Sequence, residues 1–400
     1  MHPVQLTERF VLDPLRLWAS AGEAMLAPFA PHNAAARASR AGFEAVRAFT
    51  GPGHSPAFNL DVQPEVLNAQ PFGRLLYFAG RFGGGDAPRY VLIAPLSGHH
   101  ATLLRPTVDA LLDTGDVLLV EWHSADDVPL TEGVLDYDRY VDHLRAFMRA
   151  AADADTSRSY HAIAVCQPGP PLINALSAMA ATGEPGRPAS ASLIGAPMDA
   201  GATTLSLSNA LAGAGAACLS AHATERASFD RPGAGREIVP GRTQVWTLMA
   251  QQPAQHVSRW WTLVRQRLNG QDGAADAVTE FYERFGAHVA IDAALYRDTL
   301  DRVFGRRELA TGRATWHGAP LDPAVVTDIG LQTIGGDADM VCAPAETHAA
   351  HGILTGIPDA RRDRLTVPGL EHYDLFAGRR FRAQILPRVA AFALACRTGA

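Results

Sequence analysis

Between residues 74 and 195 the hydrophobic residues form short, nearly unbroken runs that are separated by longer amphipathic stretches. The runs predict strands at residues 74–79, 90–96, 116–122, 160–165 and 191–195. The amphipathic stretches predict helices at residues 102–112, 137–151 and 171–181. Strands that alternate with helices of this length form βαβ units around a mostly parallel sheet. The pattern therefore predicts an α/β fold for this part of the chain.

The α/β pattern is interrupted between residues 199 and 318, which are predicted to be helical and are rich in aromatic residues. An insertion of this size in an α/β fold usually covers the active site as a cap or lid. Most of its aromatic side chains are expected to form the core of the cap itself. The α/β pattern then resumes, with strands predicted at residues 329–334 and 364–367 and helices at residues 343–353 and 379–395.

Residues 1–70 are predicted to form an N-terminal helical segment that packs on the α/β core or extends it. Apolar residues such as Leu12, Leu17 and Met25 recur there at helical spacing. Their face is expected to pack on the protein, and contact with an external hydrophobic surface is the alternative. The predicted division is an N-terminal segment (1–70), a first core part (71–198), the cap (199–318) and a second core part (319–400).

The charged residues exclude several classes of protein. The chain of 400 residues has a formal net charge of −6, and its basic residues form no runs. This argues against a nucleic-acid surface and against a polybasic membrane patch. All 35 basic residues are arginine. Without lysine, the chain can have no P-loop lysine, no pyridoxal Schiff base and no lysine general base.

The cysteines and the N-terminal residues indicate a cytoplasmic protein. The four cysteines lie far apart and form no CxxC pair, so neither a disulfide framework nor a zinc site is expected; they are Cys166, Cys218, Cys342 and Cys396. Glu8, Arg9 and Asp13 stand where a signal peptide needs an apolar run. No segment reaches the roughly 18 apolar residues of a transmembrane helix.

Cys166 is the candidate nucleophile. It lies between the strand predicted at 160–165 and the helix predicted at 171–181. On such a strand-to-helix turn a nucleophile stands clear of the sheet, and the helix dipole favours a thiolate. Ala164 and Pro168 replace both glycines of the usual Gly-x-Ser-x-Gly turn. A buried structural cysteine is therefore the alternative interpretation.

Asp339 and His372 follow the last two predicted strands, at the strand ends where open α/β sheets place their sites. The order nucleophile, acid, histidine along the chain is that of α/β-hydrolases. His372 is predicted to be the base for the Cys166 thiol, and Asp339 to orient the imidazole and stabilise its charged form. Asp337 is the competing acid, although the spacing from Gly336 favours Asp339.

Two backbone N–H groups are predicted to bind the oxyanion of a tetrahedral intermediate. One belongs to Gln167, which follows the nucleophile at a helix N-terminus. The other is expected near His99, in a glycine-containing turn after the strand that begins at Tyr90. A turn whose histidine caps the next helix is the alternative.

The chain resembles the intracellular poly(3-hydroxybutyrate) depolymerases, the cysteine-nucleophile branch of the α/β-hydrolases that is related to polyhydroxyalkanoate synthases. The most specific motifs are Cys166-Gln167-Pro168 and the Arg379-Arg380 pair that follows His372. The matching blocks are residues 71–78, 97–105, 121–130, 165–168 and 371–382.

The resemblance implies an α/β-hydrolase fold in which Cys166 is the nucleophile, Asp339 the acid and His372 the base. It implies no cofactor. The implied substrate is poly(3-hydroxybutyrate) or another polyhydroxyalkanoate, cleaved through an acyl thioester to 3-hydroxyacid monomers or oligomers. The implied location is the cytoplasm, at storage granules.

Three alternatives stay open. A synthase-like acyltransferase would use the same three residues to elongate the polymer, but the missing Gly-x-Cys-x-Gly pattern favours hydrolysis. The chain departs from the family pattern at Glu371, beside the predicted base, which leaves another hydroxyacid ester open as the substrate. A non-catalytic granule-binding protein is the third alternative, and the presence of Cys166, Asp339 and His372 argues against it.

Overall fold

The structure, a computed structural model, describes residues 13–50, 57–82, 87–204, 206, 210–211, 220, 223–249 and 253–397. The chain divides into two compact units. The α/β unit comprises Asn59–Leu96, Leu104–Val239 and Ala290–Ala400. The helical unit comprises Met1–Phe58, Ser97–Leu103 and Pro240–Val289. Cys218 and Leu12 lie outside the described residues.

One eight-stranded sheet organises the α/β unit, with strand order β1-β2-β4-β3-β5-β6-β12-β13. The strands are β1 (Glu65–Gln70), β2 (Gly73–Phe78), β3 (Arg89–Ile93), β4 (Asp116–Trp122), β5 (His161–Val165), β6 (Ser190–Ile194), β12 (Gly330–Gly336) and β13 (Arg362–Val367). β2 pairs antiparallel with β1 and β4, and all other neighbouring pairs are parallel. The prediction of a mostly parallel sheet is confirmed.

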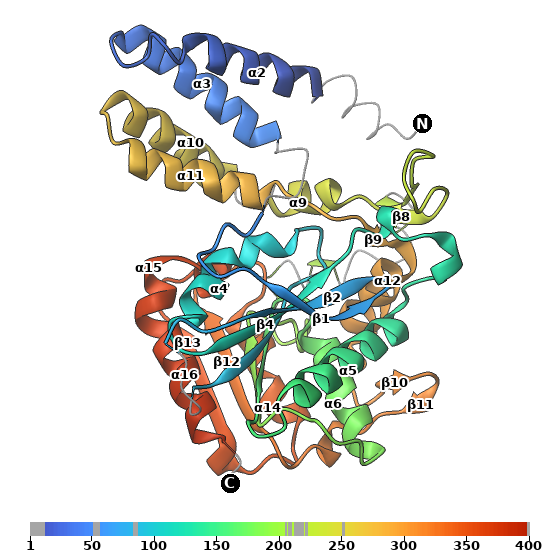
Figure 1. Cartoon of the computed structure of the whole chain (residues 1–400). Coiled ribbons are helices and arrows are strands. Elements are labelled where there is room, and N and C mark those ends of the chain that lie inside the picture. Colours follow the sequence, from blue (N-terminus) through green and yellow to red (C-terminus); the bar gives the residue numbers. More distant parts are fainter. Residues whose placement is uncertain are drawn as a thin grey trace. The chain divides into compact units, whose positions relative to one another are not determined.

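Helices cover the sheet on both sides (Figure 1). They include α4 (Arg105–Leu111), α5 (Tyr137–Ala154), α6 (Gly169–Ala181) and α16 (Leu386–Ala395). α5 and α6 pack against each other on one side. α5 begins where the Asp136 side chain accepts a hydrogen bond from the Arg139 N–H, and its buried residues recur every three or four positions. Its sequence pattern therefore determines both its start and its buried face.

Two parts of the α/β unit differ from the predicted elements. The exposed edge strand β1 lies within the segment predicted to be helical, because its alternation is too polar to read as a core strand. Short strands also occur in the predicted insertion, namely β7 (Glu225–Arg226), β8 (Glu237–Val239) and β9 (Ile291–Asp292). The interpretation of residues 199–318 as a cap stays a prediction.

Charged side chains bridge the helices of the helical unit, which are α2 (Asp13–Leu26), α3 (Ala34–Thr50), α9 (Gly241–Met249), α10 (Pro253–Leu268) and α11 (Asp272–Phe285). Arg47 on α3 pairs with Glu23 on α2 at 3.0 Å and with Glu283 on α11 at 2.9 Å. Glu44 is buried and pairs with Arg267 on α10 at 2.6 Å. Ion pairs therefore contribute to packing between these helices.

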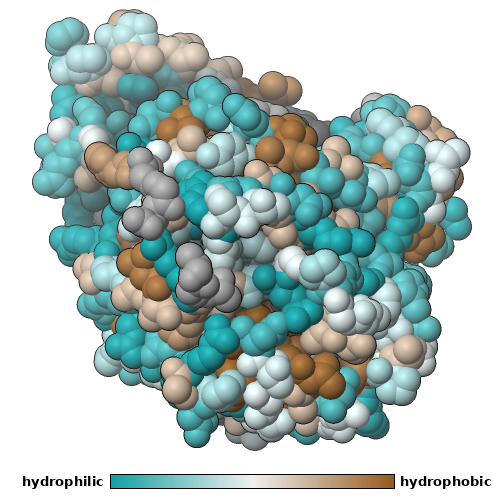
Figure 2. All heavy atoms as spheres, turned by 60° about the horizontal axis from the view of Figure 1, so that its bottom comes forward, coloured by the Kyte–Doolittle hydropathy of each residue, from teal (hydrophilic) through white to brown (hydrophobic). Residues whose placement is uncertain are grey.

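No helix in the described ranges is both long and apolar enough to cross a bilayer. The face drawn in Figure 2 carries separate small groups of hydrophobic residues among hydrophilic ones. Single exposed apolar residues of this kind are normal on protein surfaces.

Two arginine–carboxylate pairs in the β7–β8–β9 sheet predict very different effects on stability. Arg236 and Asp292 are both buried and lie 2.9 Å apart, and Arg236 also donates to the Val128 carbonyl. We expect Arg236→Ala to lower the free energy of unfolding by about 3–5 kcal/mol, because a buried carboxylate loses its partner.

The matched control is Arg226→Ala, whose partner is the exposed Glu237. We expect an effect below about 1 kcal/mol, because water screens this pair. Urea unfolding of both variants measures the difference, and equal losses would contradict the assignment of Arg236–Asp292 as a buried structural pair.

Candidate active site

Cys166 occupies a sharp turn between β5 and α6. Its φ angle is +63°, a left-handed conformation that is uncommon for a residue with a side chain. The turn is held because the Cys166 N–H donates to the Ile194 carbonyl at 2.8 Å and the Gly169 N–H donates to the Cys166 carbonyl at 3.2 Å. Non-glycine residues in this conformation cluster at functional sites.

The turn forms without the two glycines of the usual pattern because a different glycine permits the close approach. A Cβ atom on Gly169 would lie 2.5 Å from the Cβ of Ala196, which follows β6. Ala164, in the place of the first missing glycine, is fully buried. The first turn of α6 therefore packs directly on the end of the neighbouring strand, and Cys166 remains partly exposed.

Asp339 lies after β12 and is oriented by two backbone groups. Its Oδ1 accepts hydrogen bonds from the N–H groups of Val341 at 2.8 Å and Cys342 at 2.9 Å. Its Oδ2 lies 2.7 Å from Nδ1 of His372. Asp337 is exposed and accepts instead from the Gly369 N–H. The carboxylate that meets the histidine is thus Asp339.

His372 lies after β13 and joins the other two side chains. Nδ1 of its ring is hydrogen-bonded to Asp339, and the Cys166 side chain is near enough to help raise the pKa of the ring. The side chain is only 5% exposed, and the rings of Tyr373 and Phe376 meet it edge-on, with centroids at 5.7 and 5.9 Å. The structure therefore brings Cys166, His372 and Asp339 together, with Asp339 bonded directly to His372.

The surroundings of His372 favour its protonated form. Burial by itself lowers the pKa of the imidazolium, because it removes water from the charge. The negative charge and hydrogen bond of Asp339, together with the nearby Cys166 side chain, oppose burial and hold the pKa well above its ordinary value. An imidazolium between a carboxylate and a sulfur is the state that accompanies a thiolate.

Two glycines and an arginine fix His372 and its loop, and the sequence analysis did not single out one of them, Gly195. A Cβ atom on Gly195, whose φ is +57°, would lie 3.0 Å from Cε1 of the His372 ring. A Cβ atom on Gly336 would lie 2.2 Å from the carbonyl oxygen of Leu370. Arg380 donates to the Gly369 carbonyl at 2.9 Å, and the family motif with its paired arginines already pointed to this residue.

The two residues predicted to bind an oxyanion lie in different units. Gln167 adjoins Cys166 in the α/β unit, and its Oε1 accepts a hydrogen bond from the Leu96 N–H at 3.1 Å. His99 belongs to the helical unit, where it is buried and its Nδ1 lies 3.0 Å from the Phe285 carbonyl oxygen. The role of His99 in catalysis stays a prediction.

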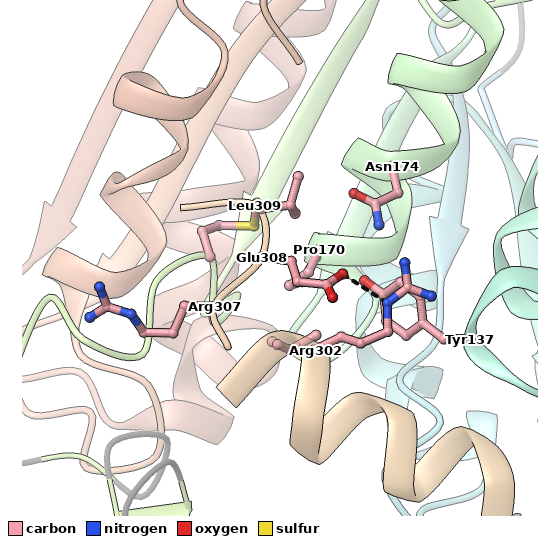
Figure 3. Close-up of a pocket in the computed structure, with 9 residues that line it drawn as sticks. Tyr137, Pro170, Asn174, Arg302, Arg307, Glu308 and Leu309 are labelled. Atoms are coloured by element: carbon pink, nitrogen blue, oxygen red, sulfur yellow. Dashed lines mark hydrogen bonds and ion pairs between the residues drawn. The ribbon is translucent and has the colours of Figure 1, made fainter. Parts of the chain in front are cut away.

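A pocket beside α6 is lined by none of the three side chains Cys166, His372 and Asp339 (Figure 3). Arg302 extends across it, pairs with Glu308 at 2.9 Å and with Asp138 at 2.6 Å, and lies 4.5 Å from the ring centroid of Tyr137. The charges of this pocket thus compensate each other. Within the described ranges, no group of three His, Cys, Asp or Glu side chains could hold a metal ion.

Residues 195–397, just over half of the chain, match the family model described as PHB de-polymerase C-terminus. The chain belongs to this family of polyhydroxybutyrate (PHB) depolymerases. No curated protein sequence matches the chain. The resemblance to PHB depolymerases is confirmed, and the chain is a carboxylic ester hydrolase. Its assignment to the cysteine-nucleophile branch stays a prediction.

Solved structures are similar to this chain. A soluble variant of monoglyceride lipase from Saccharomyces cerevisiae is 12% identical, and the match covers 86% of this chain and 99% of that one with a TM-score of 0.50. An esterase from a Rhodococcus species is 15% identical, with coverage of 83% and 100% and a TM-score of 0.45. These identities show the fold alone. Together with the strand order, the lipase confirms the predicted α/β-hydrolase fold.

Gly195→Ala is expected to lower kcat/KM about 10- to 100-fold, because a methyl group at this position displaces the His372 ring. The control is Gly312→Ala, which has a similar φ of +66° but no atom within 4 Å of the added Cβ. Ester hydrolysis by both variants measures the effect. Equal losses would show that backbone strain, and not contact with His372, causes the change.

Asp339→Asn is expected to lower the His372 pKa, because burial is then opposed by the Cys166 side chain alone. In the native protein the raised pKa adds stability below the unfolded-state pKa of about 6.5, and this stability is lost as the pH rises through the folded-state pKa. In the variant less of this low-pH stability is present.

The loss of unfolding free energy caused by Asp339→Asn should therefore be larger at about pH 6 than at about pH 9. Urea unfolding at both pH values measures it, with Asp337→Asn as the control that leaves His372 unchanged. A loss that does not depend on pH would contradict the assigned ion pair.

Proposed function

We propose that this protein hydrolyses poly(3-hydroxybutyrate) or a related polyhydroxyalkanoate, with Cys166 as nucleophile, His372 as base and acid, and Asp339 as the orienting carboxylate. The observation that carries the proposal is the Asp339–His372 pair that lies beside Cys166, which occupies the left-handed turn after β5. Membership of the PHB depolymerase family supports the choice of polymer.

The first step is acylation. The Cys166 thiolate attacks an ester carbonyl carbon of the polymer, and the carbonyl oxygen becomes an oxyanion. The Gln167 N–H, beside the nucleophile, is the first proposed donor to that oxyanion, and an N–H near His99 is the second. When the intermediate collapses, the C–O bond breaks and the imidazolium of His372 gives its proton to the leaving hydroxyl group of the polymer.

The second step is hydrolysis of the thioester. His372 is now neutral and takes a proton from water as the water oxygen attacks the acyl carbon. The C–S bond breaks, the 3-hydroxyacid or its oligomer leaves as the acid, and the thiolate–imidazolium pair is restored. Asp339 stabilises the imidazolium in both steps, which the raised pKa of His372 supports. The cycle needs no redox partner.

Attachment to polymer granules is part of the proposal, and the outer face of α2 supports it. This α2 face consists of apolar residues at helical spacing, all of them exposed: Pro14, Leu17, Trp18, Ala21, Ala24 and Met25. The exposed Pro28 and Phe29 extend it into the turn that follows α2. The charged Glu23 of α2 turns instead toward Arg47 on α3. A helix with its large apolar side chains outward is suited to an apolar surface, and the aliphatic polyester provides one.

The proposed location is the cytoplasm, at these granules. Cys166, Cys342 and Cys396 are free thiols in the structure, and free thiols persist in the reducing cytoplasm. A thiol nucleophile also requires such conditions, because its thiolate is readily oxidised.

Cys166→Ala is expected to lower the release of 3-hydroxybutyrate from amorphous polyester about a thousandfold or more, because no thioester can form. The control is Cys396→Ala, which removes a buried thiol elsewhere in the α/β unit and should keep the native rate. Undiminished release by Cys166→Ala would sink the proposed mechanism. If the native protein also releases no 3-hydroxybutyrate but cleaves other esters in a reaction that needs Cys166, only the proposed substrate is wrong.

The double variant Leu17→Gln and Met25→Gln is expected to bind amorphous polyester granules about tenfold less, because it places polar groups on the α2 face. Hydrolysis of a soluble trimer of 3-hydroxybutyrate should not change. The control is Phe229→Gln, which alters an even more exposed apolar residue of the α/β unit. Unchanged granule binding in co-sedimentation, or a loss of self-association instead, would exclude the α2 face as the polymer contact.

A further inference from the structure

The loop that leaves β3 is held by side chains on both sides of Pro95. The Trp122 indole N–H donates to the Ala94 carbonyl at 2.9 Å. The Leu96 N–H donates to Oε1 of Gln167 at 3.1 Å. Because proline has no N–H of its own, these two bonds are well placed to fix the direction in which the chain leaves the strand.

A second contact joins the two bonds into one network. The Tyr140 hydroxyl, on α5, donates to the same Gln167 Oε1 at 3.2 Å. The Tyr140 ring stacks on the Trp122 ring, with centroids 4.4 Å apart and planes at 26°. Trp122, Tyr140, Gln167 and the loop thus hold one another, and we call this arrangement the Gln167 clamp.

In the clamp the Gln167 side chain accepts both hydrogen bonds. Burial raises the pKa of Tyr140 well above its ordinary value, so its hydroxyl stays a neutral donor at working pH. The Leu96 N–H is also a donor. Two donors that meet at one atom require an acceptor there, so the carbonyl oxygen of the Gln167 amide must point into the clamp.

Gln167 and the loop are also where the sequence predicts the two oxyanion donors. The Gln167 N–H adjoins Cys166, and Leu96 leads directly into the stretch predicted to carry the second donor. We propose that the Gln167 side chain, oriented by Tyr140, holds the loop at Leu96 beside the residue that follows the nucleophile, so that the Gln167 N–H is in place for the oxyanion before substrate binds. The inference rests on the proposed function, which supplies the oxyanion.

The chemistry of the clamp accounts for glutamine at this position. Alanine would leave the Leu96 N–H and the Tyr140 hydroxyl without their common acceptor. Glutamate would accept both bonds but would place a negative charge next to a developing oxyanion. Glutamine is the side chain of this length that accepts both bonds and remains neutral. The side chains of Gln167 and Tyr140 are therefore positioning groups, distinct from the Gln167 N–H that is proposed to bind the oxyanion.

The test compares Gln167→Ala, Gln167→Glu and Tyr140→Phe with the native protein, using p-nitrophenyl butyrate as substrate. For Gln167→Ala and Gln167→Glu we expect kcat to fall about 100-fold while KM changes less than about threefold, because the loss is confined to the transition state. For Tyr140→Phe we expect kcat to fall only about tenfold, since the hydrogen bond from the Leu96 N–H to Gln167 remains. The matched control is Tyr160→Phe, which removes another buried tyrosine hydroxyl, bonded to the Gly186 carbonyl.

A trifluoromethyl ketone provides a readout that needs no turnover, because its adduct with the Cys166 thiolate carries an oxyanion like that of the intermediate. Its affinity, measured by ¹⁹F NMR, should fall in parallel with kcat/KM in the clamp variants. The rate at which iodoacetamide alkylates Cys166 should not change, because that reaction forms no oxyanion. Tyr160→Phe should lose stability without losing inhibitor affinity.

Two results would overturn the clamp. One is that Gln167→Ala and Tyr140→Phe lose no more affinity for the trifluoromethyl ketone than the control Tyr160→Phe does. The other is an equal fall in inhibitor affinity and alkylation rate, which would indicate general damage to the site. A native protein that fails to cleave polyester but shows the expected inhibitor pattern would overturn the proposed function and support the clamp.

Discussion

The left-handed turn at Cys166 is the constraint on which the rest of the site depends. A non-glycine residue at φ +63° persists only where its surroundings hold it, and here β6 and the first turn of α6 do so through backbone hydrogen bonds and the close contact at Gly169. The turn places the Cys166 sulfur at the carboxyl end of the parallel sheet, where the loops that follow β12 and β13 begin. Asp339 and His372 need only these two loops to reach it.

Glycine and arginine set the positions of these loops more than the three reactive side chains do. Gly336 allows a backbone contact that any Cβ atom would prevent, and a Cβ atom on Gly195 would crowd the His372 ring, so these glycines let His372 and its loop approach the sheet. Arg380 ties the same loop from outside through a backbone carbonyl. In a chain whose basic residues are all arginine, the fixed geometry of the guanidinium group suits this use, because one side chain can bind several carbonyls and carboxylates.

The sequence predicted the sheet well because its central strands are buried on both faces and leave continuous apolar runs. The edge strand β1 was missed because its exposed, polar pattern resembles a loop. Spacing favoured Asp339 over Asp337, and the structure pairs Asp339 with His372 because its carboxylate is also bound by two backbone N–H groups. The second bond of Gln167, from Tyr140, joins residues 27 positions apart, and no local pattern carries that information.

The central claim is that the acyl group of the substrate passes through Cys166. The most direct measurement is to mix the protein with the 3-hydroxybutyrate trimer, quench with acid during turnover, and map the adduct by mass spectrometry. The mechanism predicts a 3-hydroxybutyryl group, or its oligomer, on the peptide that contains Cys166, and its removal by hydroxylamine. An adduct on a serine, or turnover that continues in Cys166→Ala with no adduct on any residue, would contradict the account.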